Sequence, residues 1–264
     1  MGRLPDYFRF EGAPTADEKK VVRGKDYRFT VITDRLIRLE YDDSGIFEDG
    51  VTASVSDRNF GEVSFEADDR EDRLTISTPY FTLEYLKTGR FTKDNLTILQ
   101  PLRTPWYFGS PTDNLGGAAR TLDRVNGECE IGEGVCSRSG VAVIDDSKSV
   151  LIAEDGMLEQ RRSYDICDVY LFVYGDEYLD AVKDYFRLTG KPSLLPAFAM
   201  GNWWSRYYKY TEKTYEELMT RFFERDIPFS VSVIDMDWHL VDIDEKYGTG
   251  WHCKGVLHKV FVHV

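Results

Sequence analysis

The stretch Pro196–Trp238, PAFAMGNWWSRYYKYTEKTYEELMTRFFERDIPFSVSVIDMDW, decides how this chain is organised. It opens with a short apolar run, Ala197–Trp204, which predicts a β-strand. A helical pattern follows, with Thr214 as the expected N-cap and an acidic capping-box partner three residues later. Pro228 separates this helix from a second apolar run, Phe229–Ile234, which predicts a strand buried on both faces of a parallel sheet. The stretch therefore predicts a strand–helix–strand unit.

Polar and aromatic residues gather at the ends of both predicted strands. Arg206 and Tyr207 follow the first strand, and the group Asp235–Trp238 follows the second. In a barrel of alternating strands and helices, the loops after the strand carboxyl ends build the active site, which favours a ligand-binding role for the two Asp residues. Asp also caps turns often. Both interpretations of Asp235 and Asp237 stay open on spacing alone.

The stretch resembles the start of the catalytic barrel in glycoside hydrolase family 31, the α-glucosidase and α-xylosidase family. That family opens its barrel with a Pro-x-x-Ala-x-Gly strand and a Trp/Ser/Arg/Tyr end, and its second strand follows an x-Ile-Pro turn and ends in Asp-x-Asp-aromatic. The matching residues here are Pro196, Ala199, Gly201, Trp204, Ser205, Arg206, Tyr207, Ile227, Pro228 and Asp235–Trp238. The similarity extends back through Tyr174-Gly175 and Thr189–Pro192, and less distinctly over most of the upstream chain.

The resemblance implies a glycosidase that hydrolyses O-glycosyl α-linkages, with an α-linked oligosaccharide or glycoside as its partner and no cofactor. The Asp at the end of the second strand would bind sugar hydroxyls in the subsite that holds the cleaved residue. The predicted substrate-binding residues are Asp235, Asp237, Arg206, Tyr207, Trp204 and Trp238, the aromatic rings serving as apolar walls. An ion pair with an Asp is the equal alternative for Arg206.

Catalysis needs a second set of residues, because a retaining glycosidase uses two carboxylates about 5 Å apart. In the family both are Asp residues on later barrel strands, and we expect neither position within these 264 residues. An eight-stranded barrel takes about 250 residues. We therefore predict a truncated barrel and an isolated chain without activity. The alternative, from a different class, is a non-catalytic carbohydrate-binding or structural product of a truncated reading frame.

The upstream part predicts an antiparallel β-sandwich, which the resemblance makes galactose-mutarotase-like. Segments with partial alternation between residues 20 and 105 are Tyr27–Ile32, Leu36–Tyr41, Leu74–Ser77 and Phe81–Tyr85, with turn residues between them. A further strand, Asp168–Val173, precedes an amphipathic helix that Gly190 ends. We predict a sandwich domain with this connector helix over residues 1–190, and the first β/α units of a TIM barrel over 191–264.

Two segments of the sandwich, Asn114–Asp123 and Ser137–Ser147, resemble the loop with which the family's sandwich helps shape the sugar pocket. The family more often has Arg-Asp-Gly-Trp where this chain has Arg138–Val141, so two residues suited to contact sugar are absent here. Three acidic residues of these segments are expected to be solvated turn residues: Asp123, Asp145 and Asp146.

The overall charge excludes several partners. A net charge of −13 and a pI near 4.8 disfavour nucleic acids and anionic membranes, which need a basic surface. The first residues lack an apolar signal region and no run reaches membrane-spanning length, so we expect a cytoplasmic protein without a membrane partner.

The four cysteines, Cys129, Cys136, Cys167 and Cys253, are expected to be reduced, and a Cys129–Cys136 disulfide is the lesser alternative. No metal site is expected at His252, Cys253, His258 and His263.

Overall fold

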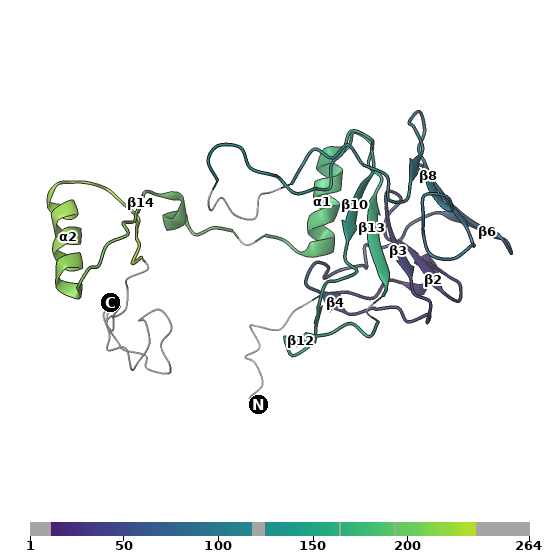
Figure 1. Ribbon diagram of the computed structural model, residues 1–264, viewed down its shortest axis with the longest axis horizontal. Coiled ribbons are helices and arrows are strands. Elements are labelled where there is room, and N and C mark those ends of the chain that lie inside the picture. Colours follow the sequence, from purple (N-terminus) through teal and green to yellow (C-terminus); the bar gives the residue numbers. More distant parts are fainter. Residues whose placement is uncertain (1–11, 118–124, 164, 193, 236–264) are drawn as a thin grey trace. The chain divides into compact units, whose positions relative to one another are not determined.

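The computed structural model describes residues 12–117, 125–163, 165–192 and 194–235 of the chain (Figure 1). The chain divides into two compact units, Met1–Pro192 and Ser193–Val264. The first unit is mainly β, as the sequence predicts, and the described part of the second unit contains a short strand–helix–strand segment.

Two five-stranded antiparallel sheets form most of the first unit. The first sheet has the strand order β1 (Val21–Arg23), β2 (Tyr27–Val31), β3 (Leu36–Tyr41), β13 (Cys167–Phe172) and β10 (Ala142–Asp145). The second has the order β5 (Glu66–Asp69), β6 (Arg73–Ser77), β7 (Thr82–Leu86), β8 (Leu96–Leu99) and β9 (Trp106–Tyr107). The five strands that the sequence predicts in this unit are all present, each within one residue at either end.

Smaller elements complete the first unit. They are the 3₁₀ helix η2 (Glu18–Lys20), the helix α1 (Tyr178–Thr189), and a three-stranded sheet of β12 (Leu158–Glu159), β11 (Leu151–Ile152) and β4 (Val51–Thr52). Gly190 follows α1 with a φ of 97°, a value that favours glycine, and ends the helix as predicted.

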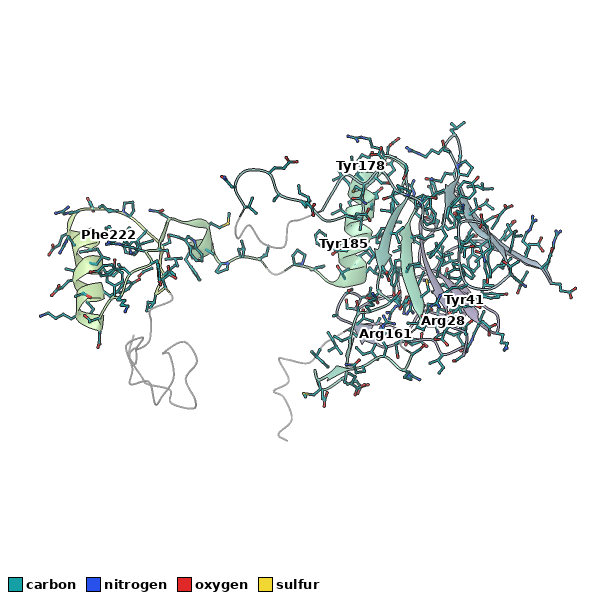
Figure 2. All side chains as sticks on the ribbon, viewed as in Figure 1. Arg28, Tyr41, Arg161, Tyr178, Tyr185 and Phe222 are labelled. Atoms are coloured by element: carbon teal, nitrogen blue, oxygen red, sulfur yellow. The ribbon has the colours of Figure 1, made fainter. Side chains whose placement is uncertain are left out.

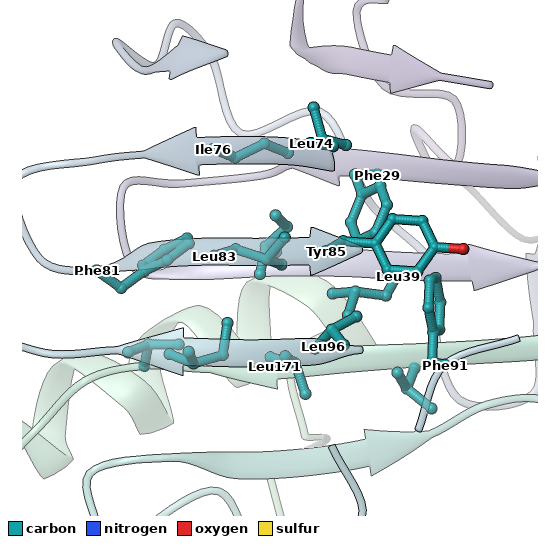
Figure 3. Packing of buried hydrophobic residues seen from close by; sticks show 14 of the residues in the cluster. Phe29, Leu39, Leu74, Ile76, Phe81, Leu83, Tyr85, Phe91, Leu96 and Leu171 are labelled. Carbon is teal, nitrogen blue, oxygen red and sulfur yellow. The ribbon is translucent and has the colours of Figure 1, made fainter. Parts of the chain in front are cut away.

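The main core lies between the two large sheets, which makes the first unit a β-sandwich. Phe29 and Leu39 from the first sheet pack against Leu74 and Leu83 from the second, and all four are fully buried (Figure 3). Burying a side chain of this size stabilises the fold by about 1.5–3 kcal/mol. The alternation in the sequence sets this arrangement, since every second residue of β3 faces this core.

The opposite face of the first sheet is also buried. Near the start of β3, Leu36 and Phe172 belong to a second apolar cluster that includes Ala181 and Leu188 of α1. Figure 1 shows α1 beside β10 and β13, on the side of the first sheet away from β6 and β8. All six residues of β3 are therefore buried, including its two charged ones.

Those charged residues belong to a group that we call the buried charge cluster. Its members are Arg28, Arg38, Glu40, Asp146, Arg161 and Asp168, each less than a tenth exposed. Arg28 donates two hydrogen bonds to Glu40 at 2.6 and 2.8 Å, and Arg38 donates two to Asp168, both at 2.8 Å. Arg161 contacts Asp168 at 3.0 Å and Asp146 at 3.1 Å, so carboxylates and guanidinium groups alternate through the cluster. Arg28 and Arg161 lie at the same end of the first unit (Figure 2).

Two opposing effects set the pKa values of the carboxyl groups in the cluster: burial raises them and the neighbouring arginines lower them. Burial is the largest influence on Asp168 and raises its pKa, but Arg38 and Arg161 outweigh it and hold that pKa at about 2. Burial and the charge of Asp168 raise the pKa of Asp146. Burial likewise raises the pKa of Glu40, against the opposing effect of Arg38. The cluster is stable only with its pairs complete, because a buried charge without its partner is costly.

The prediction that Asp146 is a solvated turn residue is wrong. Asp146 is fully buried and accepts hydrogen bonds from the Thr52 hydroxyl at 2.9 and 3.1 Å. Asp145, the preceding residue, is exposed and accepts a hydrogen bond from the amide of Ser147, as a turn residue does. Asp123 lies outside the described residues.

The described part of the second unit contains the 3₁₀ helix η3 (Ala197–Met200), the strands β14 (Trp203–Trp204) and β15 (Val231–Ser232), and the helix α2 (Glu212–Glu224) between them. The predicted strand over Ala197–Trp204 is wrong in its first half. Pro196 accepts a hydrogen bond from the Ala199 amide at 2.9 Å and starts a helical turn, and Ala and Met have low β-propensity. The second strand is shorter than the predicted Phe229–Ile234.

Two further expectations for this unit are corrected. The N-cap of α2 is Thr211, one turn before the predicted Thr214, and the two threonines form a reciprocal capping box. The burial expected for the second strand is not found either: Val231 is half-buried and Ser232 is exposed. Within the described residues β15 has one strand neighbour, β14, so its other edge carries no strand there.

Several predictions concern ligands and location. Cys129, Cys136 and Cys167 are free thiols, whereas Cys253 and the three histidines near it lie outside the described residues. Across the described ranges, no three His, Cys, Asp or Glu side chains are arranged to hold a metal ion. In the same ranges no helix has the length and apolarity needed to cross a membrane. The cytoplasmic location stays a prediction.

Candidate functional site

The candidate site is the carboxyl edge of the strand pair in the second unit. β14 and β15 are parallel, with Trp203 opposite Val231 and Trp204 opposite Ser232. Beyond the pair, the Val233 amide donates a hydrogen bond to the Trp204 carbonyl at 2.9 Å. Because the strands run in the same direction, the residues that follow them leave from the same edge. The pairing therefore brings the Arg206–Tyr207 segment and Asp235 to one end of this unit.

Helix α2 packs on one side of the strand pair and fixes the crossover. The ring of Phe222 lies 4.7 Å from that of Trp204 and 5.4 Å from that of Phe229, centroid to centroid, in edge-on geometry. Near the other end of α2, the Tyr215 hydroxyl donates to the Val233 carbonyl at 2.9 Å. These contacts make a β-α-β unit whose strand ends are held in register by the helix.

The predicted site residues occupy different surroundings. Tyr207 is 63% exposed, and the guanidinium of Arg206 lies 4.5 Å from the centroid of the Tyr208 ring. Within residues 194–235 Arg206 makes no ion pair, so the alternative of a structural Arg206–Asp pair gains no support there. Asp235 is half-buried. Asp237 and Trp238 lie outside the described residues.

Trp204 differs from the others because its ring faces the helix. Its contact with Phe222 places the indole on the α2 side of the strand pair, where it contributes to packing. The neighbouring Trp203 is 54% exposed, and its indole N–H donates to the Ala199 carbonyl at 3.0 Å. A role of Trp204 in contacting sugar stays a prediction.

A second concave surface lies in the first unit, beside the segments that resemble a pocket-shaping loop. Gly116 and Gly117 line a cavity of about 830 Å³ together with Tyr185 and Phe186 of α1. The side chain of Asn114 holds this segment, since its amide donates to the Gly134 carbonyl and its oxygen accepts from the Gly116 and Gly134 amides. Sequence patterns did not reveal this cavity, because α1 and the Gly-rich segment meet only in the folded chain.

Comparisons with known proteins find sequence similarity in the second unit. Residues 192–254 match the sequence model of the glycosyl hydrolases family 31 TIM-barrel domain. The chain is 34% identical over 82 residues to an α-xylosidase of Saccharolobus solfataricus, a match covering 29% of this chain and 11% of that protein. It is 37% identical over 71 residues to α-glucosidase 2 of Bacillus thermoamyloliquefaciens, covering 27% and 9% respectively.

Solved structures show the same fold over more of the chain. A family 31 dextranase of Flavobacterium johnsoniae in complex with glucose superposes with a TM-score of 0.52 at 16% identity, covering 83% of this chain and 32% of that one. A family 31 α-xylosidase from a soil metagenome in complex with xylose gives 0.53 at 13%, covering 83% and 41%.

The chain is similar to glycoside hydrolase family 31 in sequence over residues 192–254 and in fold over most of its length. It spans about a tenth of the length of the curated relatives that it matches.

Proposed function

We propose that this chain forms the sandwich and the first barrel units of a retaining α-glycosidase that acts on α-glucosides or α-xylosides. The proposal divides the chain at residue 190, between a sandwich domain with its connector helix and the start of a (β/α)₈ barrel. The observation that carries it is the parallel β14–β15 pair with its crossover helix α2, which lies inside the segment matched by the family's barrel model. A strand, a helix and a parallel strand are the repeating unit of that barrel.

In this proposal the carboxyl edge of the strand pair is part of the sugar subsite. Asp235 and Asp237 accept hydrogen bonds from hydroxyls of the sugar to be cleaved, and carboxylates suit this role because charge-assisted hydrogen bonds are the stronger kind. Tyr207, Trp238 and Trp204 offer apolar faces to sugar C–H groups, with Arg206 as a further polar group. The exposure of Tyr207 is consistent with this role.

The chemistry itself requires two more carboxylates. In a retaining reaction one attacks the anomeric carbon, while the other protonates the leaving oxygen and later activates water. We assign neither role to a residue of this chain. Side chains two positions apart in an extended segment point the same way, so the spacing of Asp235 and Asp237 does not suit a pair that flanks a glycosidic bond from opposite sides.

The proposal is tested by a chimera. In the Saccharolobus solfataricus α-xylosidase, the segment that corresponds to residues 192–254 of this chain is replaced by those residues. We expect the chimera to hydrolyse p-nitrophenyl α-xyloside or α-glucoside, and the isolated chain to hydrolyse neither. A chimera that folds like its parent by circular dichroism but is inactive on both substrates contradicts the proposal. Tight maltose binding by the isolated chain favours the non-catalytic alternative.

A further inference from the structure

The first unit contains a second, smaller cavity that is rich in arginine. It has a volume of about 280 Å³ and lies on the outer face of the first sheet, next to the buried charge cluster. The charged side chains that line it are Arg23, Arg28, Arg38, Arg58, Glu18 and Asp49. Four cations therefore face two carboxylates, an excess of positive charge in a protein whose net charge is −13.

Two of these arginines are fully paired. Arg28 binds Glu40 through two hydrogen bonds and also contacts Asp49 at 2.8 Å. Arg38 binds Asp168 and lies 3.1 Å from Glu40. Their charges are thus balanced within the protein, and the excess belongs to the other two arginines.

Arg58 is the unusual member of the lining. Its side chain is 1% exposed, and it donates to the Tyr170 hydroxyl at 2.6 Å and to the carbonyls of Pro14 and Gly50 at 2.8 and 2.9 Å. All three acceptors are neutral, and within the described residues no carboxylate pairs with it. Its Nη2 group is buried without a hydrogen-bond partner in the same part of the chain. A buried guanidinium in that state costs several kcal/mol unless an anion completes it.

Arg23 lies at the same cavity and is exposed. Its guanidinium contacts the Gly45 carbonyl at 3.5 Å and lies 5.0 Å from the centroid of the Phe47 ring, and it has no carboxylate partner among the described residues. Two arginines of the cavity lining therefore lack a carboxylate partner among the described residues. Arg58 has a buried N–H donor without an acceptor, and the exposed Arg23 has no carboxylate beside it.

We propose that this cavity binds a small oxyanion, with inorganic phosphate as its representative, between Arg58 and Arg23. The several oxygens of a phosphate match the planar N–H donors of two guanidinium groups. Its size also fits, because a cavity of this volume falls below the range of about 300–1,000 Å³ typical of sites for larger organic ligands. All residues that line this cavity belong to the first unit, whereas the residues of the proposed sugar subsite belong to the second.

The test is thermal unfolding of the full 264-residue chain in phosphate against sodium chloride of equal ionic strength. At a phosphate concentration 20-fold above the dissociation constant, the unfolding midpoint rises by about 4 °C over the chloride sample. Arg23→Gln, a change at an exposed position that leaves the fold intact, weakens phosphate binding at least fivefold in calorimetry. Arg90→Gln, which removes an exposed arginine from outside the cavity, keeps wild-type binding.

Two results overturn the proposal. One is a wild-type chain with no phosphate-dependent rise in midpoint and no heat of phosphate binding. The other is an equal phosphate response in the wild type, Arg23→Gln and Arg90→Gln, which indicates a general salt effect on the protein surface. Arg58→Gln is a further variant, and where it folds it abolishes the binding heat. Retention of that heat in a folded Arg58→Gln chain also refutes the site.

Discussion

Replacement of Arg38 by methionine is the sharpest test of how the sandwich is held together. The side chain is 1% exposed and donates three hydrogen bonds at 2.8 Å, two to the carboxylate of Asp168 and one to the Glu48 carbonyl. It also lies 3.1 Å from the carboxylate of Glu40. Methionine fills similar space without the charge, so Asp168 and Glu40, both fully buried, lose a counter-ion that they share.

The expected loss is about 3–5 kcal/mol in the free energy of unfolding, the usual cost of leaving a buried ion without its partner. The assay is urea unfolding followed by far-ultraviolet circular dichroism. Arg90→Met is the matched control, because Arg90 also pairs with an aspartate, Asp165 at 2.8 Å, but with side chains that are 40% and 85% exposed. An exposed pair of this kind is worth about 1 kcal/mol or less.

Comparable losses for Arg38→Met and Arg90→Met, both under about 1 kcal/mol, would show that the buried ion pairs stabilise the sandwich no more than an exposed pair does. A second check is the double variant Arg38→Met/Asp168→Asn. Since the two residues contact each other directly, the double variant should lose at least about 1 kcal/mol less than the sum of the single losses.

Four further predictions follow from particular contacts. The pKa of Asp168 is about 2 in the folded state against an ordinary value of 3.8, so ionisation of this group adds about 2 kcal/mol to the free energy of unfolding above pH 4. This contribution is lost as the pH falls from 4 to 2. The difference in urea stability between the wild type and Asp168→Asn should therefore shrink across that window, and a constant difference contradicts the prediction. Thr211→Ala removes the capping box of α2 and should cost about 1 kcal/mol of local stability by hydrogen exchange of α2 amides, whereas Thr220→Ala, at an exposed position inside the helix, should not. Asp235→Asn should leave maltose binding by the isolated chain unchanged and very weak in calorimetry, and tight binding that the substitution abolishes would contradict the prediction that these residues alone do not form a complete sugar subsite. Limited proteolysis should leave the sandwich unit intact, and cleavage scattered through residues 20–105 would argue against its independent stability.

The sandwich was predictable because its signal is local. In β3 the order Leu-Ile-Arg-Leu-Glu-Tyr alternates, and Ile37, Leu39 and Tyr41 face the main core as period-2 patterning requires. The same alternation did not reveal that Arg38 and Glu40 are also buried. Burial of the second face depends on segments far away in sequence, such as Asp168, which lies 130 residues from Arg38.

The wrong predictions for Asp146 and for Ala197–Met200 arise because local sequence does not specify the contacts made in the fold. Asp145-Asp146-Ser147 has the composition of a turn, and nothing local distinguishes the exposed Asp145 from the buried Asp146. The distinction comes from Thr52, which lies 94 residues from Asp146 in sequence. At Ala197–Met200 the apolar run predicts a strand, but apolarity alone does not separate a strand from a helical turn that starts at a proline.

The order of the candidate site residues along the chain was predictable from the sequence, but their contacts in the folded protein were not. The sequence motifs indicate Arg206, Tyr207 and Asp235 after two successive strands, and the parallel register brings both strand ends to one edge. That the Trp204 ring faces Phe222 of α2 follows from the register and the helix position, which no motif specifies.

The most direct test of the account is the effect of Asp235→Asn in the α-xylosidase chimera. We predict that kcat/KM on the p-nitrophenyl α-glycoside falls about 100-fold, since a charged acceptor of sugar hydroxyls is lost. Glu216→Gln, which changes an exposed carboxylate on α2 in the same segment, should leave kcat/KM within about twofold of the unmodified chimera. Equal kcat/KM values for the unmodified, Asp235→Asn and Glu216→Gln chimeras would contradict the claim that this strand end binds the substrate.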